Sequence, residues 1–166
     1  MTHSPEIEHI IQQSIEYSKE RKHQYVTVEH LLLSLITHSA FKKCLVSFGA
    51  DIDSMALEIG AYLDSLHAIV SKEEEVVPRK TNSLERVMNR SVTQVLFSGR
   101  RQVTTIDLYL SIAAEGNSHA HYFLLKYGIN KNEFVAHWQK HYKHNENTNL
   151  TDNQADEILE EYTINL

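Results

Sequence analysis

Apolar residues recur every three or four positions along most of the chain, which is the spacing of one face of an α-helix. Between Ser4 and Glu20 this face consists of four isoleucines, while charged and amide side chains fill the positions between them. The same spacing continues over three further segments, residues 28–36, 40–48 and 52–66. The pattern therefore predicts four amphipathic helices in the first part of the chain.

Residues that begin or end helices stand at the borders of these segments. Ser4, Thr27 and Asp51 can each accept a hydrogen bond from an early backbone N–H, and Gly49 can end the third helix in the left-handed conformation. In the second part of the chain three pairs are spaced for reciprocal N-terminal capping. These pairs are Asn82 with Glu85, Thr104 with Asp107, and Asn130 with Glu133.

The second part of the chain repeats the first. A shift of 77 positions places the isoleucine face of residues 7–15 on the apolar face of residues 84–92, and residues 26–35 on residues 103–112. Two inserted residues then change the shift to 79, which places residues 44–49 on residues 123–128. Two units with one-sided apolar faces can bury those faces against each other. We therefore predict an all-α fold of about eight helices, in which a duplicated four-helix motif packs as one domain with internal twofold pseudosymmetry.

The repeat also sets the expected domain boundaries. We expect one domain over residues 1–142, followed by a polar, flexible linker over residues 143–157 and a short terminal segment over residues 158–166. Within the domain, the first repeat covers about 4–66, a loop covers 67–80 and the second repeat covers about 81–142.

Composition narrows the classes of protein to which the chain can belong. A net charge of −6 argues against non-specific binding to nucleic acid, and the longest apolar run is far shorter than a membrane-spanning helix needs. The single cysteine, Cys44, cannot form an internal disulfide, and we expect it in the core. Without a visible signal peptide, we expect a cytoplasmic protein that has no nucleic-acid or membrane partner.

The sequence carries no recognisable catalytic motif. A phosphate-binding loop, the G-x-S-x-G elbow and the H-E-x-x-H zinc motif are all missing, so we expect no enzyme activity and no catalytic residue. Histidines at 137, 141 and 144, and at 119 and 121, have spacings that suit a metal. We interpret them as surface residues and expect no metal or cofactor site, because no third or fourth converging ligand is evident. A small-molecule or metal-dependent enzyme is a further hypothesis, which stoichiometric metal or substrate consumption would support.

Three segments resemble the amino-terminal domain of the Clp family of AAA+ unfoldases, nearest to the ClpA type. They are TVEHLLL at 27–33, SLERVMNR at 83–90 and SGRRQVT at 98–104. The resemblance covers about residues 1–142, and residues 158–166 resemble the start of the first ATPase module. It implies a domain that docks the adaptor ClpS and protein substrates for a hexameric ATPase working with the ClpP peptidase. ATP and magnesium would then bind in modules beyond Leu166, and the isolated domain would be a monomer.

The resemblance also implies a set of adaptor-binding residues. Glu29, Thr81 and Arg90 match the pattern of the family, whereas Lys131 replaces an arginine and Gln24 replaces a glutamate. Arg90 lies opposite the apolar stripe of its helix, so we expect it to be free for a partner. Three further arginines, Arg86, Arg100 and Arg101, are interpreted as part of a solvated face. The alternatives are a ClpC-type domain that uses other adaptors, and a freestanding helical interaction protein.

Overall fold

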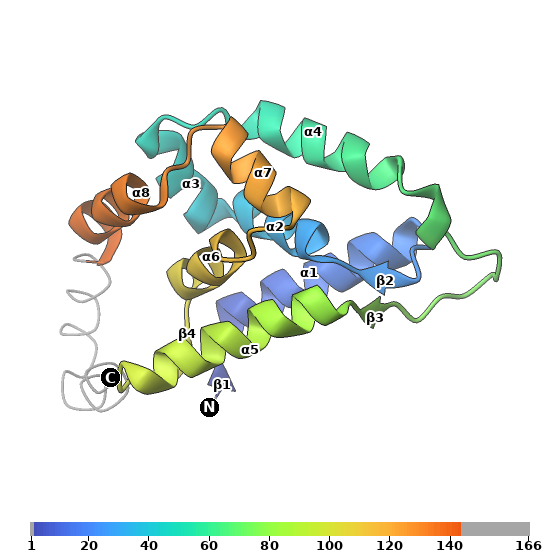
Figure 1. Cartoon of the computed structure of the whole chain (residues 1–166), viewed down its shortest axis with the longest axis horizontal. Helices are drawn as coiled ribbons and strands as arrows, with labels where there is room; N and C mark the ends of the chain where they lie inside the picture. Colours follow the sequence, from blue (N-terminus) through green and yellow to red (C-terminus); the bar gives the residue numbers. More distant parts are fainter. Residues whose placement is uncertain (1, 144–166) are drawn as a thin grey trace.

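The computed structural model describes residues 2–143 and contains eight α-helices in two sets of four (Figure 1). The first set is α1 (Pro5–Glu20), α2 (Val28–Thr37), α3 (Ser39–Phe48) and α4 (Ile52–Asp64). The second set is α5 (Asn82–Phe97), α6 (Thr105–Ala113), α7 (His119–Lys126) and α8 (Lys131–Trp138). The 3-10 turn η1 (His67–Ile69) follows α4, and the π-helical turn η2 (Gln139–Lys143) continues α8. The predicted all-α fold is confirmed. Lys143, the first residue of the predicted linker 143–157, belongs to η2, and residues 144–157 and the terminal segment 158–166 lie outside the described residues.

The helices follow the register of the predicted repeat. The bounds of α5 are those of α1 moved by 77 positions, and α8 together with η2 covers the length of α4 moved by 79. Backbone turns repeat as well, because Gly49 and Gly128 both have positive φ angles, of 110° and 72°. Lys22, with a φ of 58°, occupies the position that Gly99, with a φ of 76°, holds in the second repeat.

Two short parallel strand pairs join the repeats, and the helical periodicity did not predict them. β1 (Thr2–His3) pairs with β4 (Gln102–Val103), and β2 (Tyr25–Val26) pairs with β3 (Arg79–Lys80). Moved by 77 positions, β1 falls on β3 and β2 falls on β4, so the two strand pairs are equivalent and each repeat contributes one strand to each pair. Together with η1, β3 also corrects the prediction that residues 67–80 form only a loop. Strands of two residues are too short to show the alternation from which a strand is predicted.

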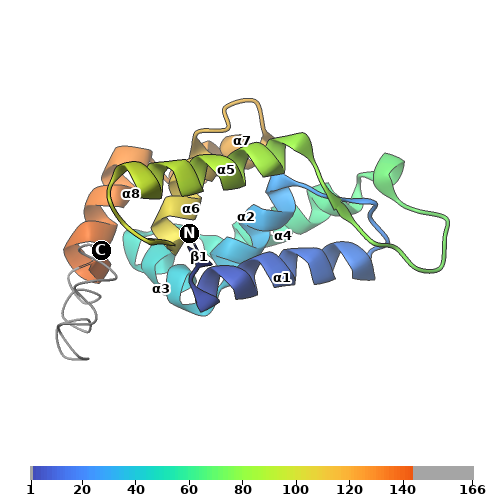
Figure 2. The same ribbon diagram turned by 90° about the horizontal axis from the view of Figure 1, so that it is seen from below.

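Helix α2 lies at the centre of the core. Seven of its ten residues are buried, and it packs against α1, α3 and α4 of its own repeat and against α5, α6 and α7 of the other. In Figure 2, α1 and α5 lie on opposite sides of a layer that contains α2 and α6. The predicted core position of Cys44 is confirmed, and burial raises the pKa of its thiol to about 12.

Most of the predicted helix caps are confirmed. The side chains of Ser4, Asp51 and Asn130 accept hydrogen bonds from backbone N–H groups three residues later. Of the predicted reciprocal pairs, Thr104 with Asp107 is confirmed, whereas Asn130 with Glu133 shows only the bond from Glu133 N to Asn130. The prediction for α5 was wrong by one residue, because Thr81 Oγ1 accepts from Leu84 N at 3.1 Å and Asn82 is already the first helical residue.

The caps of α2 and α6 share one geometry but differ in chemistry. At α6, the carboxylate of Asp107 accepts from Thr104 N at 2.8 Å and is paired with Arg100. At α2, His30 Nδ1 accepts from Thr27 N at 2.9 Å, and His30 Nε2 lies 2.9 Å from His23 Nδ1. His23 and His30 stand 77 positions before Arg100 and Asp107, so a neutral imidazole pair occupies the place of an ion pair.

Candidate functional site

The β2–β3 pair brings two of the predicted site residues together. Gln24 O accepts from Arg79 N at 2.9 Å, and Val26 O accepts from Thr81 N at 3.1 Å. Gln24 N in turn donates to Ile69 O at 2.7 Å, which fixes the chain after α4 beside the strand. Gln24 and Thr81 are therefore held at opposite ends of one short strand pair, at the junction of the two repeats.

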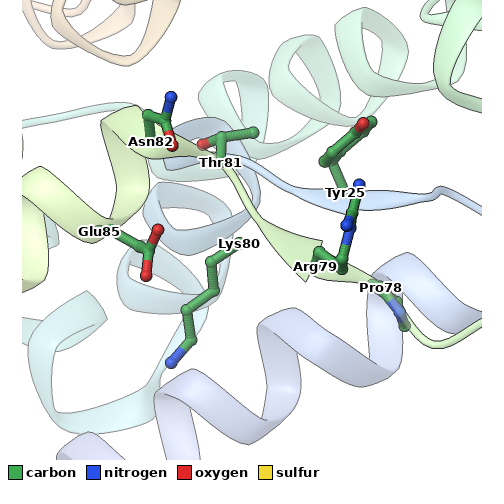
Figure 3. Close-up of a pocket in the computed structure, with 7 residues that line it drawn as sticks. All are labelled: Tyr25, Pro78, Arg79, Lys80, Thr81, Asn82 and Glu85. Carbon is green, nitrogen blue, oxygen red and sulfur yellow. The ribbon is translucent and has the colours of Figure 1, made fainter.

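A groove of about 820 Å³ opens beside this pair, at the start of α5 (Figure 3). It is lined by Tyr25, Pro78, Arg79, Lys80, Thr81, Asn82 and Glu85. A second groove of about 480 Å³ includes Gln24 and the loop before β3, and Arg79 lines both grooves. We call the two together the junction grooves. Their cations, carboxylate and amide suit polar recognition of a protein surface.

Thr81 is half-buried and has a structural role as well as a position in the groove. Its hydroxyl oxygen accepts from Leu84 N as the N-cap of α5, while the hydroxyl proton remains available to a partner. A serine at this position would keep both properties, whereas an alanine would lose the cap.

Glu29 is a brace between the repeats. Its side chain is buried, with 7% of the residue exposed, and Oε2 accepts from Ala120 N in the first turn of α7 at 3.0 Å. A carboxylate at the positive end of a helix is stabilising. Burial and then the charge of Glu29 raise the pKa of the nearby Tyr62 hydroxyl. The first-turn position of Glu29 in α2 was evident from the sequence, but its partner lies 91 residues away.

Arg90 is not free, and this prediction was wrong. Its Nη1 donates to Ser111 O at 2.7 Å and its Nη2 to Glu115 Oε1 at 2.9 Å. Arg86 is exposed, as the solvated-face interpretation expected, but it also pairs with the same carboxylate. Hydrogen bonding from Arg86, supported by Arg90, holds the pKa of Glu115 below its usual value although burial acts in the opposite direction. Arg86 and Arg90 reach this carboxylate because the fold places Glu115, which follows α6, beside α5.

The remaining cations are either paired within the domain or exposed. Arg100 is paired with the buried Asp107, which corrects its interpretation, whereas Arg101 is exposed as expected. Lys131 is exposed at the start of α8, and Figure 1 shows α8 and β3 at opposite ends of the domain. The five predicted residues are therefore not one contiguous surface: Gln24 and Thr81 share the junction, Glu29 and Arg90 hold helices together, and Lys131 lies apart.

The described residues, 2–143, contain no cluster of metal-binding side chains. No group of three or more histidine, cysteine, aspartate or glutamate side chains there can hold a metal ion. His119 Nδ1 lies 3.0 Å from the Tyr62 hydroxyl and His121 Nδ1 2.8 Å from Ala113 O, so the two rings are engaged separately. His144 lies outside the described residues.

A contact between Ser47 and His137 has the composition of a nucleophile with its base. Ser47 Oγ lies 2.8 Å from His137 Nε2, but it also donates its proton to Cys44 O at 2.9 Å. The Tyr142 hydroxyl also lies 3.1 Å from Ser47 Oγ, and while Ser47 donates to Cys44 O its proton is not directed at the imidazole, as it would be in an activated nucleophile.

No single helix of the described chain is both long and apolar enough to cross a membrane; the bent pair α2 and α3 is the one combination that meets the length and composition test.

Comparisons with known proteins give a consistent result. Residues 2–127 match the family described as the Clp repeat (R) N-terminal domain. A curated relative, the ClpA homolog protein of Fuscovulum blasticum, is 30% identical over 140 residues, which are 81% of this chain and 17% of that protein. The chain thus spans about a sixth of the length of that relative.

Solved structures share the fold at low sequence identity. The Hsp104 N-terminal domain from Candida albicans has a TM-score of 0.68 at 12% identity, over 82% of this chain and 89% of that one. The N-terminal domain of the ClpV1 ATPase from the E. coli EAEC Sci1 T6SS has a TM-score of 0.64 at 15% identity, over 81% and 82%.

Proposed function

The chain belongs to the Clp repeat N-terminal domain family, and on this basis we propose that it is the docking domain of an ATP-dependent Clp unfoldase of the ClpA type. In this proposal the domain holds the adaptor ClpS, and protein substrates with it, for unfolding by the ATPase and degradation by ClpP. ATP and magnesium act in ATPase modules outside these 166 residues, within a cytoplasmic hexamer. The isolated domain is a monomer.

The observation that carries the proposal is the pair of junction grooves. They contain Gln24 and Thr81, two of the three predicted adaptor-binding residues whose side chains do not hold helices together; the third, Lys131, lies apart. Arg79 and Lys80 supply positive charge beside Glu85, so acidic and polar groups of a partner find complementary charges.

The backbone of β3 adds a second mode of recognition. Arg79 N and Thr81 N donate to β2, and alternate residues of a strand direct their N–H groups to opposite sides. The backbone of Lys80 therefore faces away from β2, where an extended segment of the adaptor can pair with it as an added strand.

Docking of this kind works through a tether between the domain and the ATPase. A domain tethered to an ATPase raises the effective concentration of captured cargo near the pore, while the tether leaves the domain free to reorient. The proposal therefore needs no catalytic group in the domain.

The proposal is tested by calorimetric titration of the domain with ClpS of the source organism. Gln24→Ala and Arg79→Ala remove side chains that line the junction grooves without removing a helix cap, and each should weaken binding at least fivefold. Thr81→Ser should bind as the wild type does. Absence of heat at micromolar concentrations, or unchanged affinity in both alanine variants, would refute the proposal.

Two further variants distinguish residues that contact the adaptor from residues that only stabilise the fold. Glu29→Gln and Arg90→Lys keep a hydrogen-bonding group in place, so a loss of binding with unchanged thermal unfolding assigns these residues to the interface itself. Lys131→Ala tests the extent of the interface: binding weakened as much as in Gln24→Ala means that the adaptor reaches α8, and the junction grooves alone are then insufficient.

A further inference from the structure

The groove between the first two helices of each repeat is filled in the second repeat and open in the first. Between α5 and α6, the groove is occupied by the guanidinium groups of Arg86 and Arg90, which converge on the buried Glu115. The residues 77 positions earlier, between α1 and α2, are His9, Gln13 and His38. Because these side chains are shorter than arginine, the place of the two guanidinium groups is left open in the first repeat.

The open groove between α1 and α2 measures about 620 Å³, and we call it the α1–α2 groove. Ile10, Tyr17 and Leu33 provide apolar surface, and Glu16 and Glu20 place two exposed carboxylates on its α1 side. Its lining contains no lysine or arginine. The lining shares no residue with the junction grooves, so it is a separate surface.

The end of α2 adds negative potential to this groove. In the second repeat, Ser111 O accepts from Arg90 Nη1 at 2.7 Å. In the first repeat, the equivalent residue Ser34 lines the groove; its carbonyl oxygen lies 3.4 Å from the Thr37 hydroxyl, and the N–H of His38 bonds to Leu35 O. The last turn of α2 carries no basic residue, so the negative end of the helix dipole is not compensated there.

The charged residues around the groove leave the carboxylates of Glu16 and Glu20 accessible to a partner. Glu16 accepts from the neutral Gln12 side chain at 3.0 Å. Glu20 lies 4.0 Å from Arg21, whose Nε donates to Asp64 at 3.2 Å and whose guanidinium lies 3.6 Å from the centre of the Tyr17 ring. His38 is held by Glu6, with 2.7 Å between His38 Nε2 and the carboxylate, and so does not compete for Glu16 or Glu20.

We propose that the α1–α2 groove binds an arginine side chain in a segment of a partner protein. The guanidinium takes the position that Arg90 holds in the second repeat, donating to Ser34 O and to the Gln13 amide oxygen. Glu16 and Glu20 neutralise its charge, and Ile10 and Leu33 contact its methylene groups. A planar fork of five donors suits a carbonyl beside carboxylates better than the single ammonium of lysine does. This site is independent of the adaptor site and does not rest on the proposed function.

The probe is a capped pentapeptide, acetyl-Gly-Arg-Gly-Arg-Gly-amide, compared with versions in which lysine or the neutral isostere citrulline replaces arginine. Chemical shifts of the ¹⁵N-labelled domain are followed during titration. We expect changes confined to residues of the α1–α2 groove, at least threefold weaker binding of the lysine peptide and no saturable binding of the citrulline peptide. Equal binding of the arginine and lysine peptides, or changes centred elsewhere, would overturn the proposal.

Variants of the groove complete the test. Glu16→Gln with Glu20→Gln should weaken the arginine peptide at least fivefold, while Glu8→Gln, which removes an exposed carboxylate of α1 outside the groove, should not. His9→Arg, Gln13→Arg and His38→Glu together install the network of the second repeat and should abolish binding. If that variant does not fold, Gln13→Arg alone supplies one internal guanidinium and should compete with the peptide; undiminished binding in it refutes the site.

Discussion

Exchanging the buried histidine pair for its counterpart in the second repeat should change how stability depends on pH. The perturbation is His23→Arg with His30→Asp, which copies Arg100 and Asp107 into the first repeat. The substituted aspartate can accept from Thr27 N in the same capping geometry. Only the charge chemistry of the pair should differ between the two proteins.

The magnitude follows from the two imidazoles. Burial, then the neighbouring His23 ring and Arg21, lowers the pKa of His30 from 6.5 to about 3. Burial and Arg21 also lower the pKa of His23, although Asp64 opposes the shift. Below pH 6.5 the unfolded chain therefore binds more protons than the folded one. The stability that is full above pH 6.5 is lost as the pH falls toward 3, at about 1.4 kcal/mol per pH unit for His30 alone.

At pH 4.5 the loss from His30 should reach about 2.7 kcal/mol relative to pH 7.5, with a further contribution of the same sign from His23. The substituted pair should stay charged in this range, because an aspartate beside an arginine loses stabilisation only below its unfolded pKa of about 3.9. Carboxylates elsewhere protonate equally in both proteins, so the difference between their stability curves isolates the pair.

Urea unfolding at pH 7.5, 6.5, 5.5 and 4.5, followed by circular dichroism at 222 nm, measures this difference. With a slope of about 2 kcal/mol per molar urea, the wild-type midpoint should fall by about 1.3 M more than that of the variant between the two extremes. His67→Gln, which removes an exposed imidazole, should follow the wild-type curve. Parallel pH profiles for the wild type and the double variant would refute the reasoning.

Three further variants test single positions. Lys22→Gly should raise the free energy of unfolding by about 0.5 kcal/mol, because relief of a left-handed backbone exceeds the gain in unfolded-state entropy; a lower urea midpoint would contradict this. Glu115→Ala should cost about 2–3 kcal/mol by leaving two arginines without their shared carboxylate, and Glu115→Gln should cost less; equal costs would contradict the charge argument. Glu29→Ala should cost about 1–3 kcal/mol and lower the hydrogen-exchange protection of Ala120 N, whereas Glu29→Gln should retain most of it.

The fold was predictable because its signals are local. Helical spacing, capping residues and a helix-ending glycine such as Gly49 act within four residues, and the repeat shows each of them twice. The error at Asn82 illustrates the limit, because Thr81 and Asn82 are both capping residues and only the backbone shows which one precedes the helix. The strand pairs depend on contacts between the repeats, about which a two-residue segment carries no local signal.

The candidate site was less predictable because its partners are distant in sequence. Nothing around Glu29 indicates Ala120, and nothing around Arg90 indicates Glu115. One signal was available, since Arg86 and Arg90 stand four positions apart on one helix face, where two like charges favour a shared anion. Alignment of the repeats gives a second signal. Arg100 and Asp107, whose opposite charges suit an ion pair, align with two histidines, His23 and His30, in the first repeat.

The two repeats therefore differ in role: charged side chains of the second repeat stabilise the fold, whereas the first repeat offers surface for a partner. In the second repeat, Arg86, Arg90 and Arg100 are each paired with a buried carboxylate, so its cations serve to hold α5 against α6. In the first repeat, His9, Gln13 and His23 stand at the equivalent positions, and carboxylates such as Glu16 remain exposed beside an open groove. A side chain already paired within the domain must break that pairing before it can bind a partner, whereas an open groove requires no such cost. Partner recognition is therefore expected in the first repeat and at its junction with the second, and substitutions among the arginines of the second repeat should act mainly on stability.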